Sequence, residues 1–473
     1  MTDRGLASHA REVDLLITHG QVLTMDAQRR ILMDGAVAIK GRDIAAVGPT
    51  RELMDRYDAV ETWDVDGALV RPGFVDAHLH VTFQLLRGVL PDYWSEEQAW
   101  RQLWIPFWDS VTSEEEYLAS LLSFMEAVRN GSTSFVGGAT AFDLPSVMRA
   151  ANQVGVRGLL GEFVWDLEAQ PPRLARSTQE CVDRLQVQLD EYPIFGPEQR
   201  VGVCVMVLGM NTASDELLVA GRELADRYGV MMNIHQSYGR AEVQSYIDHV
   251  SGGTRPIVHL SDLGVLGPNV MLVHINHLDA EELEVLIDSG ACGIHCPSSS
   301  MKYGLGSSHG GYHPELLARG FRLALGSDSS NWSNYFDMGM QVYLAATLHR
   351  EATMVLPTIT AEQGLEMATL NGAYVMGIPD LVGALEAGRR ADIVIDKKRR
   401  PEWHPGLDVV YDLVYSAQSK TVDTVLIDGE IVLREGRFVT FDEEAAYEAI
   451  DRAARSLIER LGFSIPTRWP VIR

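Results

Sequence analysis

The sequence predicts an α/β fold in which a (β/α)8 TIM-like barrel is joined to a small β-sandwich domain formed from both chain ends. Two observations support this prediction. Eight short apolar runs alternate with helix-like sequence between residues 69 and 380, and clusters of short strand patterns flank this region on both sides. A chain of 473 residues is long enough for one large barrel and a smaller unit.

The sandwich is predicted from residues 1–68 together with residues 381–440. Short strand patterns such as Leu15-Leu16-Ile17 and Ala36-Val37-Ala38-Ile39 are separated by turn sequences such as Asp34-Gly35. Similar patterns return at residues 391–395 and 422–433, so we expect both ends of the chain to join one β-unit. Residues 441–473 are expected to form a C-terminal helical segment.

The barrel is predicted from residues 69–380. Its candidate strands are residues 69–76, 132–136, 157–163, 200–208, 230–234, 270–273, 292–294 and 323–326. Helices between them show start and stop signals, as in the run that opens at Ser113 and closes at Asn130-Gly131. Active sites of such barrels lie at the carboxyl ends of the strands, so the residues at these ends are the functional candidates.

Composition narrows the possible partners. The net charge of -25 argues against nucleic acid or an anionic membrane surface as a partner, because both require a basic face. The N-terminus lacks a signal-peptide pattern, no apolar run approaches the length of a membrane span, and the four cysteines are too scattered for a disulfide framework. We therefore expect a cytoplasmic homo-oligomer that acts on a small molecule.

Five side chains that could bind a metal ion fall at the ends of four candidate strands. His78 and His80 alternate along the first strand and so project from one face. His235, His274 and Asp328 follow the fifth, sixth and eighth strands. Each residue alone fits a structural role, such as a hydrogen-bonded histidine or a helix N-cap aspartate. Five of them at the same rim favour a metal site.

The chain resembles the amidohydrolase superfamily through the stretch Pro72-Gly73-Phe74-Val75-Asp76-Ala77-His78-Leu79-His80 and through His235, His274 and Gly326-Ser327-Asp328. Segments at residues 371–373, 383–392 and 425–429 extend the resemblance over nearly the whole chain. Within the superfamily the chain is most similar to the branch that holds atrazine chlorohydrolase, S-adenosylhomocysteine deaminase and guanine deaminase.

The resemblance implies that His78, His80, His235 and Asp328 bind one divalent metal ion, with His274 beside its water ligand. Residues 200–208 contain no lysine or glutamate that could bridge a second ion, so a single metal is expected. Three neutral imidazoles and a carboxylate suit Zn, our first choice, and also Fe, Co or Mn. Asp328 can then take a proton from the water, while His274 polarises the electrophile or orients the nucleophile.

One position departs from the deaminases of this branch, which carry a glutamate three residues after the strand-five histidine. Tyr238 stands at that position, and Glu242 is the next acid. Without the glutamate, attack on an amino-heterocycle has no group to neutralise charge on the ring. Attack on a carbonyl is less demanding, because His274 or the Tyr238 hydroxyl can stabilise an oxyanion. Packing alone is an equal alternative for Tyr238.

The sequence therefore favours a metal-dependent hydrolase that cleaves a carbon–nitrogen bond of a small amide, urea or (thio)carbamate-like compound. Phenylurea and thiocarbamate (molinate) hydrolases of the same branch are similar in this respect. Two alternatives stay open: a deaminase or dechlorinase of a purine or s-triazine, and a catalytically inactive binding protein of the same fold. A Ser-His-Asp hydrolase is disfavoured because no Gly-x-Ser-x-Gly elbow is present at a strand-to-helix turn.

Several other residues are expected near the barrel rim. The aromatic-rich segment from Gly88 to Asp109 predicts either a hydrophobic wall for the substrate or a contact with a neighbouring subunit. Residues 298–302 and 331–334 are expected to form parts of the pocket wall. Structural or supporting roles are expected for His277 and His295, and no role is assigned to His309 and His313 in their glycine-rich loop.

Overall fold

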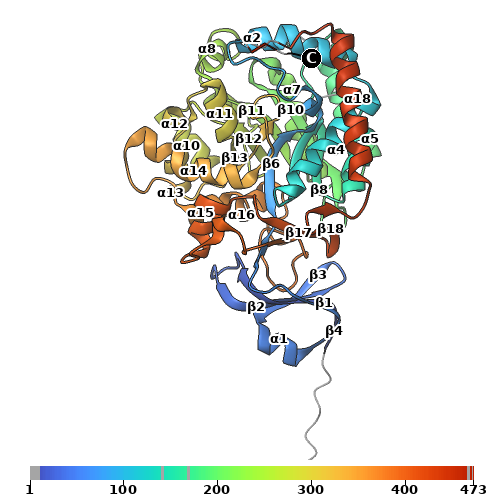
Figure 1. Cartoon of the computed structure of the whole chain (residues 1–473). Coiled ribbons are helices and arrows are strands. Elements are labelled where there is room, and N and C mark those ends of the chain that lie inside the picture. The colour runs from blue at the N-terminus through green and yellow to red at the C-terminus, as the bar shows by residue number, and fades with distance from the viewer. Residues whose placement is uncertain (1–10, 140–142, 168–170, 466–468, 471, 473) are drawn as a thin grey trace, which may run out of the picture.

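The molecule consists of a barrel surrounded by helices and a β-sheet unit assembled from both ends of the chain (Figure 1). The computed structural model describes residues 11–139, 143–167, 171–465, 469–470 and 472. Among these residues, no helix combines the length and apolar character needed to cross a membrane.

The barrel strands form two parallel five-stranded sheets, in the orders β15-β6-β7-β8-β9 and β10-β11-β12-β13-β14. The strands of the first sheet are β6 (Phe74–His80), β7 (Ser132–Ala139), β8 (Arg157–Glu162), β9 (Val201–Val203) and β15 (Asp328–Ser329). Those of the second are β10 (Val205–Gly209), β11 (Met232–Gln236), β12 (Val270–His274), β13 (Cys292–His295) and β14 (Leu323–Leu325).

The two sheets join at interruptions in the fourth and eighth predicted strands. Cys204 separates β9 from β10, and its backbone N–H donates to the Leu160 carbonyl at 2.9 Å. Gly326 and Ser327 separate β14 from β15, and the Gly326 N–H donates to the His295 carbonyl at 3.0 Å. Each sheet thus continues directly into the other along the chain, which gives the eight-stranded barrel.

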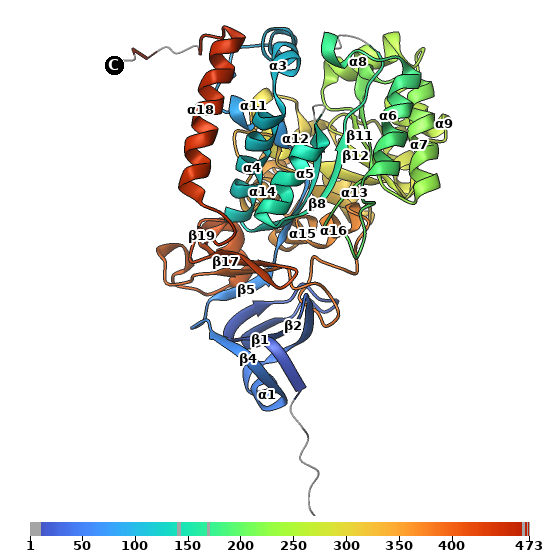
Figure 2. The same ribbon diagram turned by 90° about the vertical axis from the view of Figure 1, so that its right-hand side faces the viewer.

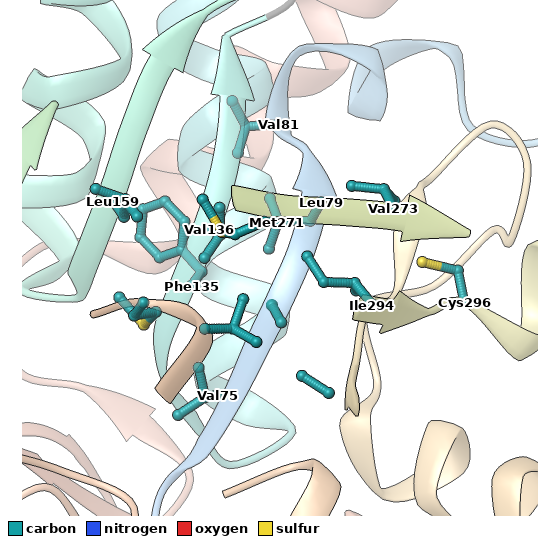
Figure 3. Close-up of a cluster of buried hydrophobic side chains, with 14 of the residues drawn as sticks. Val75, Leu79, Val81, Phe135, Val136, Leu159, Met271, Val273, Ile294 and Cys296 are labelled. Carbon is teal, nitrogen blue, oxygen red and sulfur yellow. The ribbon is translucent and has the colours of Figure 1, made fainter. Parts of the chain in front are cut away.

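Apolar side chains from several barrel strands pack together in the core of the barrel domain. Leu79, Val136, Met271 and Ile294 come from four different strands, are at most 1% exposed and lie in one cluster (Figure 3). Strands of a parallel barrel are covered by side chains on one face and by helices on the other, so they read as nearly continuous apolar runs. This is the pattern that made the strands recognisable in the sequence.

Helices cover the outside of the barrel. The helix predicted from Ser113 is α4 (Ser113–Arg129), which begins with a capping box between Thr112 and Glu115 and ends at Asn130. The others are α5 (Leu144–Val154), α6 (Thr178–Glu191), α7 (Asp215–Tyr228), α8 (Arg240–His249), α9 (Pro256–Asp262), α10 (Ala280–Ser289), α11 (Pro297–Tyr303), α12 (Ser307–Gly310), α13 (His313–Ala318), α14 (Met338–Thr353), α15 (Ala361–Met367) and α16 (Leu370–Val375), with short turns η3 (Pro172–Leu174) and η4 (Met210–Thr212).

The second unit is a nine-stranded sheet in the order β19-β18-β17-β16-β5-β1-β2-β3, with β4 paired to β1. Its strands are β1 (Arg11–Leu23), β2 (Ile31–Lys40), β3 (Asp43–Pro49), β4 (Tyr57–Asp64), β5 (Leu69–Pro72), β16 (Ile393–Asp396), β17 (Val422–Ile427), β18 (Glu430–Arg434) and β19 (Arg437–Phe438), with short helical segments α1 (Thr50–Arg56), η5 (Pro401–Trp403), α17 (Val409–Tyr411) and η6 (Asp412–Ala417). Strand β5 pairs with β1 on one side and β16 on the other, so both chain ends meet there (Figure 2).

The run predicted as the first barrel strand, residues 69–76, divides at Gly73. Residues before Gly73 form β5 of the nine-stranded sheet, and the barrel strand β6 begins only at Phe74. Both strands are buried along their whole length and apolar residues lie on either side of Gly73, so hydrophobicity alone does not separate them. As a result His78 and His80 lie within the last part of β6 rather than after it.

Helix α18 (Glu443–Leu461) forms most of the C-terminal segment and packs along the barrel beside α4 (Figures 1 and 2). Arg129 of α4 pairs with Glu443 at 2.5 Å near the start of α18, and Glu115 pairs with Arg460 at 2.5 Å near its end. Two ion pairs at opposite ends thus fix the direction in which α18 crosses α4.

Candidate active site

Five predicted side chains meet at the carboxyl ends of the barrel strands. His78 and His80 lie on β6, His235 on β11, His274 at the end of β12 and Asp328 at the start of β15. All five are buried, with at most 8% of each residue exposed. The strand order of the barrel, rather than closeness in sequence, brings them together.

Three imidazoles point their Nε2 atoms at one another. The Nε2 atoms of His78 and His80 are 3.1 Å apart, and that of His235 lies 3.2 Å from His78 and 3.3 Å from His80. Oδ1 of Asp328 is 3.6 Å from Nε2 of both His78 and His80. His274 has a ring nitrogen within 4.8 Å of the facing nitrogens of His78 and His235. Such convergence of nitrogen and oxygen donors suits a divalent metal ion.

The hydrogen bonds around these residues also fit a metal ion. Nδ1 of His235 lies 3.0 Å from the Leu208 carbonyl oxygen, and since a carbonyl only accepts, Nδ1 carries the proton. Its Nε2 therefore presents a lone pair to the centre, as in metal-binding histidines whose other nitrogen donates to the backbone. Oδ2 of Asp328 and Nδ1 of His274 are buried without a hydrogen-bond partner, so both can still interact with a ligand.

The protonation states are those of metal ligands. Burial and neighbouring imidazoles lower the pKa of His80 to about 3, and burial lowers that of His274 to about 4. Both rings are therefore neutral near pH 7. Burial alone would raise the pKa of Asp328, but the hydrogen bond to His78 and the nearby imidazoles hold it well below its usual value. The carboxyl group is therefore ionised.

Asp76 supports the site from within the barrel and was missed as a functional residue in the sequence. It is fully buried on β6 and accepts hydrogen bonds from the backbone N–H of Ser327 at 2.9 Å, from the Ser327 hydroxyl and from the N–H of His78 at 3.4 Å. It thus ties the residue before Asp328 to the strand that carries His78. A buried acid between apolar neighbours in the Phe74–His80 stretch was the available signal.

The strand ends at the site have unusual backbone conformations. His274 has φ 78° and Asp328 has φ 65°, a region that residues other than glycine adopt only at some cost in energy. Both residues therefore turn sharply as their strands end, which directs their side chains over the other three. Strained backbone of this kind is concentrated at functional sites.

A cavity of about 540 Å³ opens beside the five residues. Phe83, Trp100, Trp104, Trp108 and Trp332 supply most of its apolar wall, and its other lining residues are His80, Leu208, His235, Tyr238, His274, Asp328 and Ser329. The first of these aromatics belongs to η1 (Val81–Leu86), which follows β6 directly. The next three belong to the π-helical turn η2 (Trp100–Trp104) and to α3 (Ile105–Ser110), which come after the short α2 (Glu96–Ala99). The aromatic-rich segment therefore forms a wall of the cavity.

Tyr238 lies in the cavity wall, with its ring centroid 6.0 Å from that of His274 and 6.3 Å from that of Trp332. Glu242 is buried on α8 and is not among the described residues that line the cavity. The tyrosine three residues after His235 thus faces the candidate site.

Of the other segments predicted to form the pocket wall, one contributes to the cavity lining and the other does not. Trp332 lines the cavity and stacks between Trp104, at 5.4 Å, and Tyr303, at 4.4 Å between ring centroids. Residues 298–302 lie in α11 and are absent from the described lining, so this segment supports Trp332 through Tyr303 instead. His277 has its Nε2 2.5 Å from the Leu305 carbonyl, which is a structural contact.

Comparison with known proteins places the chain in a family. The family described as "Amidohydrolase family" matches residues 69–432, which span the whole barrel and the sheet strands β5, β16, β17 and part of β18. The chain belongs to the amidohydrolase family. The predicted superfamily, the TIM-like barrel with its composite β-sandwich, and the class of enzyme, a hydrolase acting on carbon–nitrogen bonds, are confirmed.

Curated relatives of this amidohydrolase match over nearly their full length. A 5-methylthioadenosine/S-adenosylhomocysteine deaminase from Syntrophobacter fumaroxidans is 33% identical over 445 residues, which is 94% of this chain and 98% of the relative. A 5'-deoxyadenosine deaminase from Methanosarcina mazei is 30% identical over 461 residues, which is 95% of this chain and 99% of the relative.

Solved structures show the same fold. An adenosine deaminase from Xanthomonas campestris with bound zinc superposes on this amidohydrolase with a TM-score of 0.87 and 26% identity, covering 96% of this chain and all of the other. An atrazine chlorohydrolase from Arthrobacter aurescens in complex with zinc gives a TM-score of 0.83 at 22% identity, covering 93% and 100%. At this lower identity the likeness concerns the fold alone.

Proposed function

We propose that this amidohydrolase uses a single divalent metal ion to hydrolyse a carbon–nitrogen bond of a small amide, urea or (thio)carbamate-like compound. His78, His80, His235 and Asp328 would hold the ion. The observation that carries the choice of substrate is the cavity wall, where Tyr238 takes the place of the deaminase glutamate and Asp328 is the only carboxylate among the described lining residues.

The donor set is suited to one ion. The three Nε2 atoms of His78, His80 and His235 lie 3.1–3.3 Å from one another, and Oδ1 of Asp328 lies 3.6 Å from two of them. Zn is the first choice for such a set, and Fe, Co or Mn share the preference for imidazole and carboxylate ligands. Strand four adds no acidic or lysine ligand. When bound, the ion would supply Lewis acidity and lower the pKa of a water molecule toward neutrality.

The residues around the ion can move the protons that the reaction requires. Asp328 is ionised and its Oδ2 is unpartnered, so it can accept the proton of the attacking water and return it to the nitrogen that leaves. Neutral His274 and the hydroxyl of Tyr238 can donate hydrogen bonds to the carbonyl oxygen as negative charge develops on it. No group outside the cavity is needed for these steps.

The cavity also fits the proposed substrate. Its aromatic walls favour an apolar N-alkyl or N-aryl group on the substrate. The tryptophans would exclude water from the leaving group and strengthen the hydrogen bonds made by His274 and Tyr238.

A second candidate is the hydrolytic deamination of an adenosine-type nucleoside, because the two deaminases described above are 30–33% identical over nearly the whole chain. This reaction places negative charge on a ring nitrogen, which has to be protonated. Tyr238 is a much weaker acid than a carboxyl group, and Glu242 lies off the cavity wall. We therefore rank deamination second.

The two candidates differ in what they release. The zinc-loaded enzyme is incubated with N-aryl ureas, anilides, thiocarbamates, adenosine, 5'-deoxyadenosine and 5-methylthioadenosine, and the released amine or ammonia is quantified. We expect the release of organic amines from carbonyl compounds, with kcat/KM at least tenfold above that for any nucleoside. Release of ammonia from the nucleosides as the main activity would replace the first proposal by the second.

Tyr238→Phe tests the role of the hydroxyl. We expect kcat for carbonyl cleavage to fall about 100- to 1,000-fold, the usual cost of removing one oxyanion donor, with a smaller effect on KM. Tyr246→Phe is the matched control, because that buried hydroxyl contacts Nδ1 of His259 at 3.0 Å and does not line the cavity.

His78→Ala, which removes a proposed ligand, should abolish turnover. Persistent turnover there would contradict the metal site, and metal binding without any turnover in the wild type would favour the inactive binding protein.

A further inference from the structure

A second group of buried histidines lies next to the candidate active site. The group, which we call the histidine triad, consists of His295 on β13, His313 on α13 and His349 on α14. The three residues are 0%, 0% and 2% exposed, and each offers a ring nitrogen within 4.8 Å of the others. Their ring centroids are 4.1 Å apart for His295 and His313 and 5.6 Å for each of the other two pairs.

The hydrogen bonds of the triad leave lone pairs free. Nε2 of His313 lies 3.2 Å from the backbone carbonyl oxygen of His274, so Nε2 carries the proton and Nδ1 is a lone-pair donor. A backbone hydrogen bond at Ser308 acts on His349. Nδ1 of His313, Nε2 of His349 and both ring nitrogens of His295 are buried without a hydrogen-bond partner.

The three neutral imidazoles of the triad present ring nitrogens that have no hydrogen-bond partner, and a cation could bind their lone pairs. Burial lowers the pKa of His313 to about 3 and that of His349 to about 4, and the charges that act on the three rings come from other histidines. Buried polar atoms normally have partners, and several in one place call for an unseen ligand. Protonation is disfavoured here, so a metal ion is the ligand that suits converging lone pairs.

We propose that the histidine triad binds one divalent transition metal ion, with zinc as the best match for three imidazoles, at a site separate from the catalytic one. The backbone hydrogen bonds of His313 and His349 fix the ring orientations, as is usual for metal-binding histidines. His349 also lines a surface cavity of about 960 Å³, shared with Ser308 and His309, which provides a path of entry.

The ion in the triad would fasten three elements together close to the catalytic residues. The ion would join β13, α13 and α14. Because His313 also donates a hydrogen bond to the backbone carbonyl of His274, fixing the position of His313 would fix the position of that carbonyl as well. His274 has the strained φ of 78°, so the support of its carbonyl helps to hold that conformation. Occupancy of the triad should therefore stabilise the fold and the position of His274.

Metal content tests this proposal independently of any activity. The protein is saturated with ZnCl2, passed through a desalting column and assayed for bound zinc. We expect about two equivalents per chain in the wild type and about one in His349→Gln. His309→Ala changes a histidine at the cavity mouth outside the triad and should keep two. Equal zinc content in the wild type and His349→Gln would overturn the proposal.

A second variant covers the case in which triad substitutions fail to fold. His78→Ala/His235→Ala removes two catalytic ligands and leaves the triad intact, so it should bind one zinc ion and show a higher thermal unfolding midpoint in the presence of zinc. Loading it with Co²⁺ should give the visible absorption bands of a site with imidazole ligands. No bound zinc in this variant would refute the triad site, and it would leave the proposed function untouched.

Discussion

Two buried carboxyl groups on neighbouring barrel strands have opposite electrostatic environments. Asp328 faces the imidazoles of His78 and His274, which hold its pKa well below the usual value. Burial raises the pKa of Asp76 to about 7, although the hydrogen bonds from Ser327 act against the shift. Asp328 is therefore suited to binding a cation and accepting a proton, whereas Asp76 is suited to holding β6 against β15.

Glu116 is a buried acid outside the site, and its effect on stability can be measured. It lies on α4 with 0% exposure, and burial together with Asp143 and Glu162 raises its pKa well above the usual value. The folded state therefore holds this proton to a higher pH than the unfolded state. Its contribution to stability is complete below the unfolded pKa of about 4.5 and is lost as the pH rises through the folded pKa.

We therefore expect Glu116→Gln to gain stability relative to the wild type as the pH rises, by about 1.4 kcal/mol per pH unit until the folded pKa is reached. Urea unfolding at pH 6, 7.5 and 9 measures this difference. Glu114→Gln, which changes a side chain 64% exposed on the same helix, is the control and should show no such trend. A difference between Glu116→Gln and wild type that does not vary with pH would contradict the assignment.

The residues with metal-binding chemistry could be predicted because each one ends a strand. His235 and His274 follow clear apolar runs, so their place at the rim depends only on the barrel topology. The histidine triad could not be predicted as a unit, because His313 and His349 lie on helices whose packing against β13 has no local sequence signal. Asp76 was missed for a related reason, since its partner Ser327 lies far along the chain.

At the level of elements, the end of β10 positions the middle of the site. Gly209 ends β10 beside His235 of β11 with φ 80° and ψ −153°, a conformation that is essentially restricted to glycine. A Cβ at this position would lie 2.3 Å from the His235 carbonyl oxygen. The two strands can therefore approach only because residue 209 has no side chain.

Gly209→Ala should displace His235 and weaken metal binding at the catalytic site. We expect at least a tenfold loss of zinc affinity, the scale of effect seen when the support of a ligand is disturbed, together with a lower thermal unfolding midpoint. Gly229→Ala is the matched control, since Gly229 has φ 65° and open space around its Cβ position. It also places alanine at a positive φ, in the less costly left-handed region with ψ 35°, and it does not touch His235. Equal zinc affinity in both variants would refute the steric argument.

The order of elements could be predicted from the alternating pattern, but their exact division could not. Both β5 and β6 are buried and have apolar residues next to Gly73, so the run at residues 69–76 looks like one strand although Gly73 divides it between two sheets. The break between β9 and β10 at Cys204 also cannot be predicted from the hydrophobic pattern, because Val203, Cys204 and Val205 are all buried. Which sheet a strand joins depends on partners distant in the chain.

At the scale of the whole molecule, buried ion pairs hold the nine-stranded sheet against the barrel. Arg157 at the start of β8 donates from Nε and Nη2 to Asp392 at 3.1 Å each, and it also pairs with Asp428. Within the sheet, Arg71 of β5 pairs with Asp396 of the neighbouring strand β16 at 2.8 Å. All of these side chains are at most 7% exposed. The composition shows many charges but not which of them meet across the interface.

Removal of Arg157 should loosen this junction more than removal of an exposed arginine. Arg157→Met keeps much of the side-chain volume but leaves Asp392 buried without its guanidinium, and breaking such a buried pair costs about 3–5 kcal/mol. Arg149→Met removes the pair with Glu114, whose side chains are 54% and 64% exposed, so about 0–1 kcal/mol is expected. Both values come from urea unfolding followed by tryptophan fluorescence. The lost stability comes from the buried and unpaired Asp392. Arg157→Met/Asp392→Leu should therefore recover part of the free energy of unfolding that Arg157→Met loses. A double variant less stable than Arg157→Met would show that the junction depends on shape rather than on charge pairing.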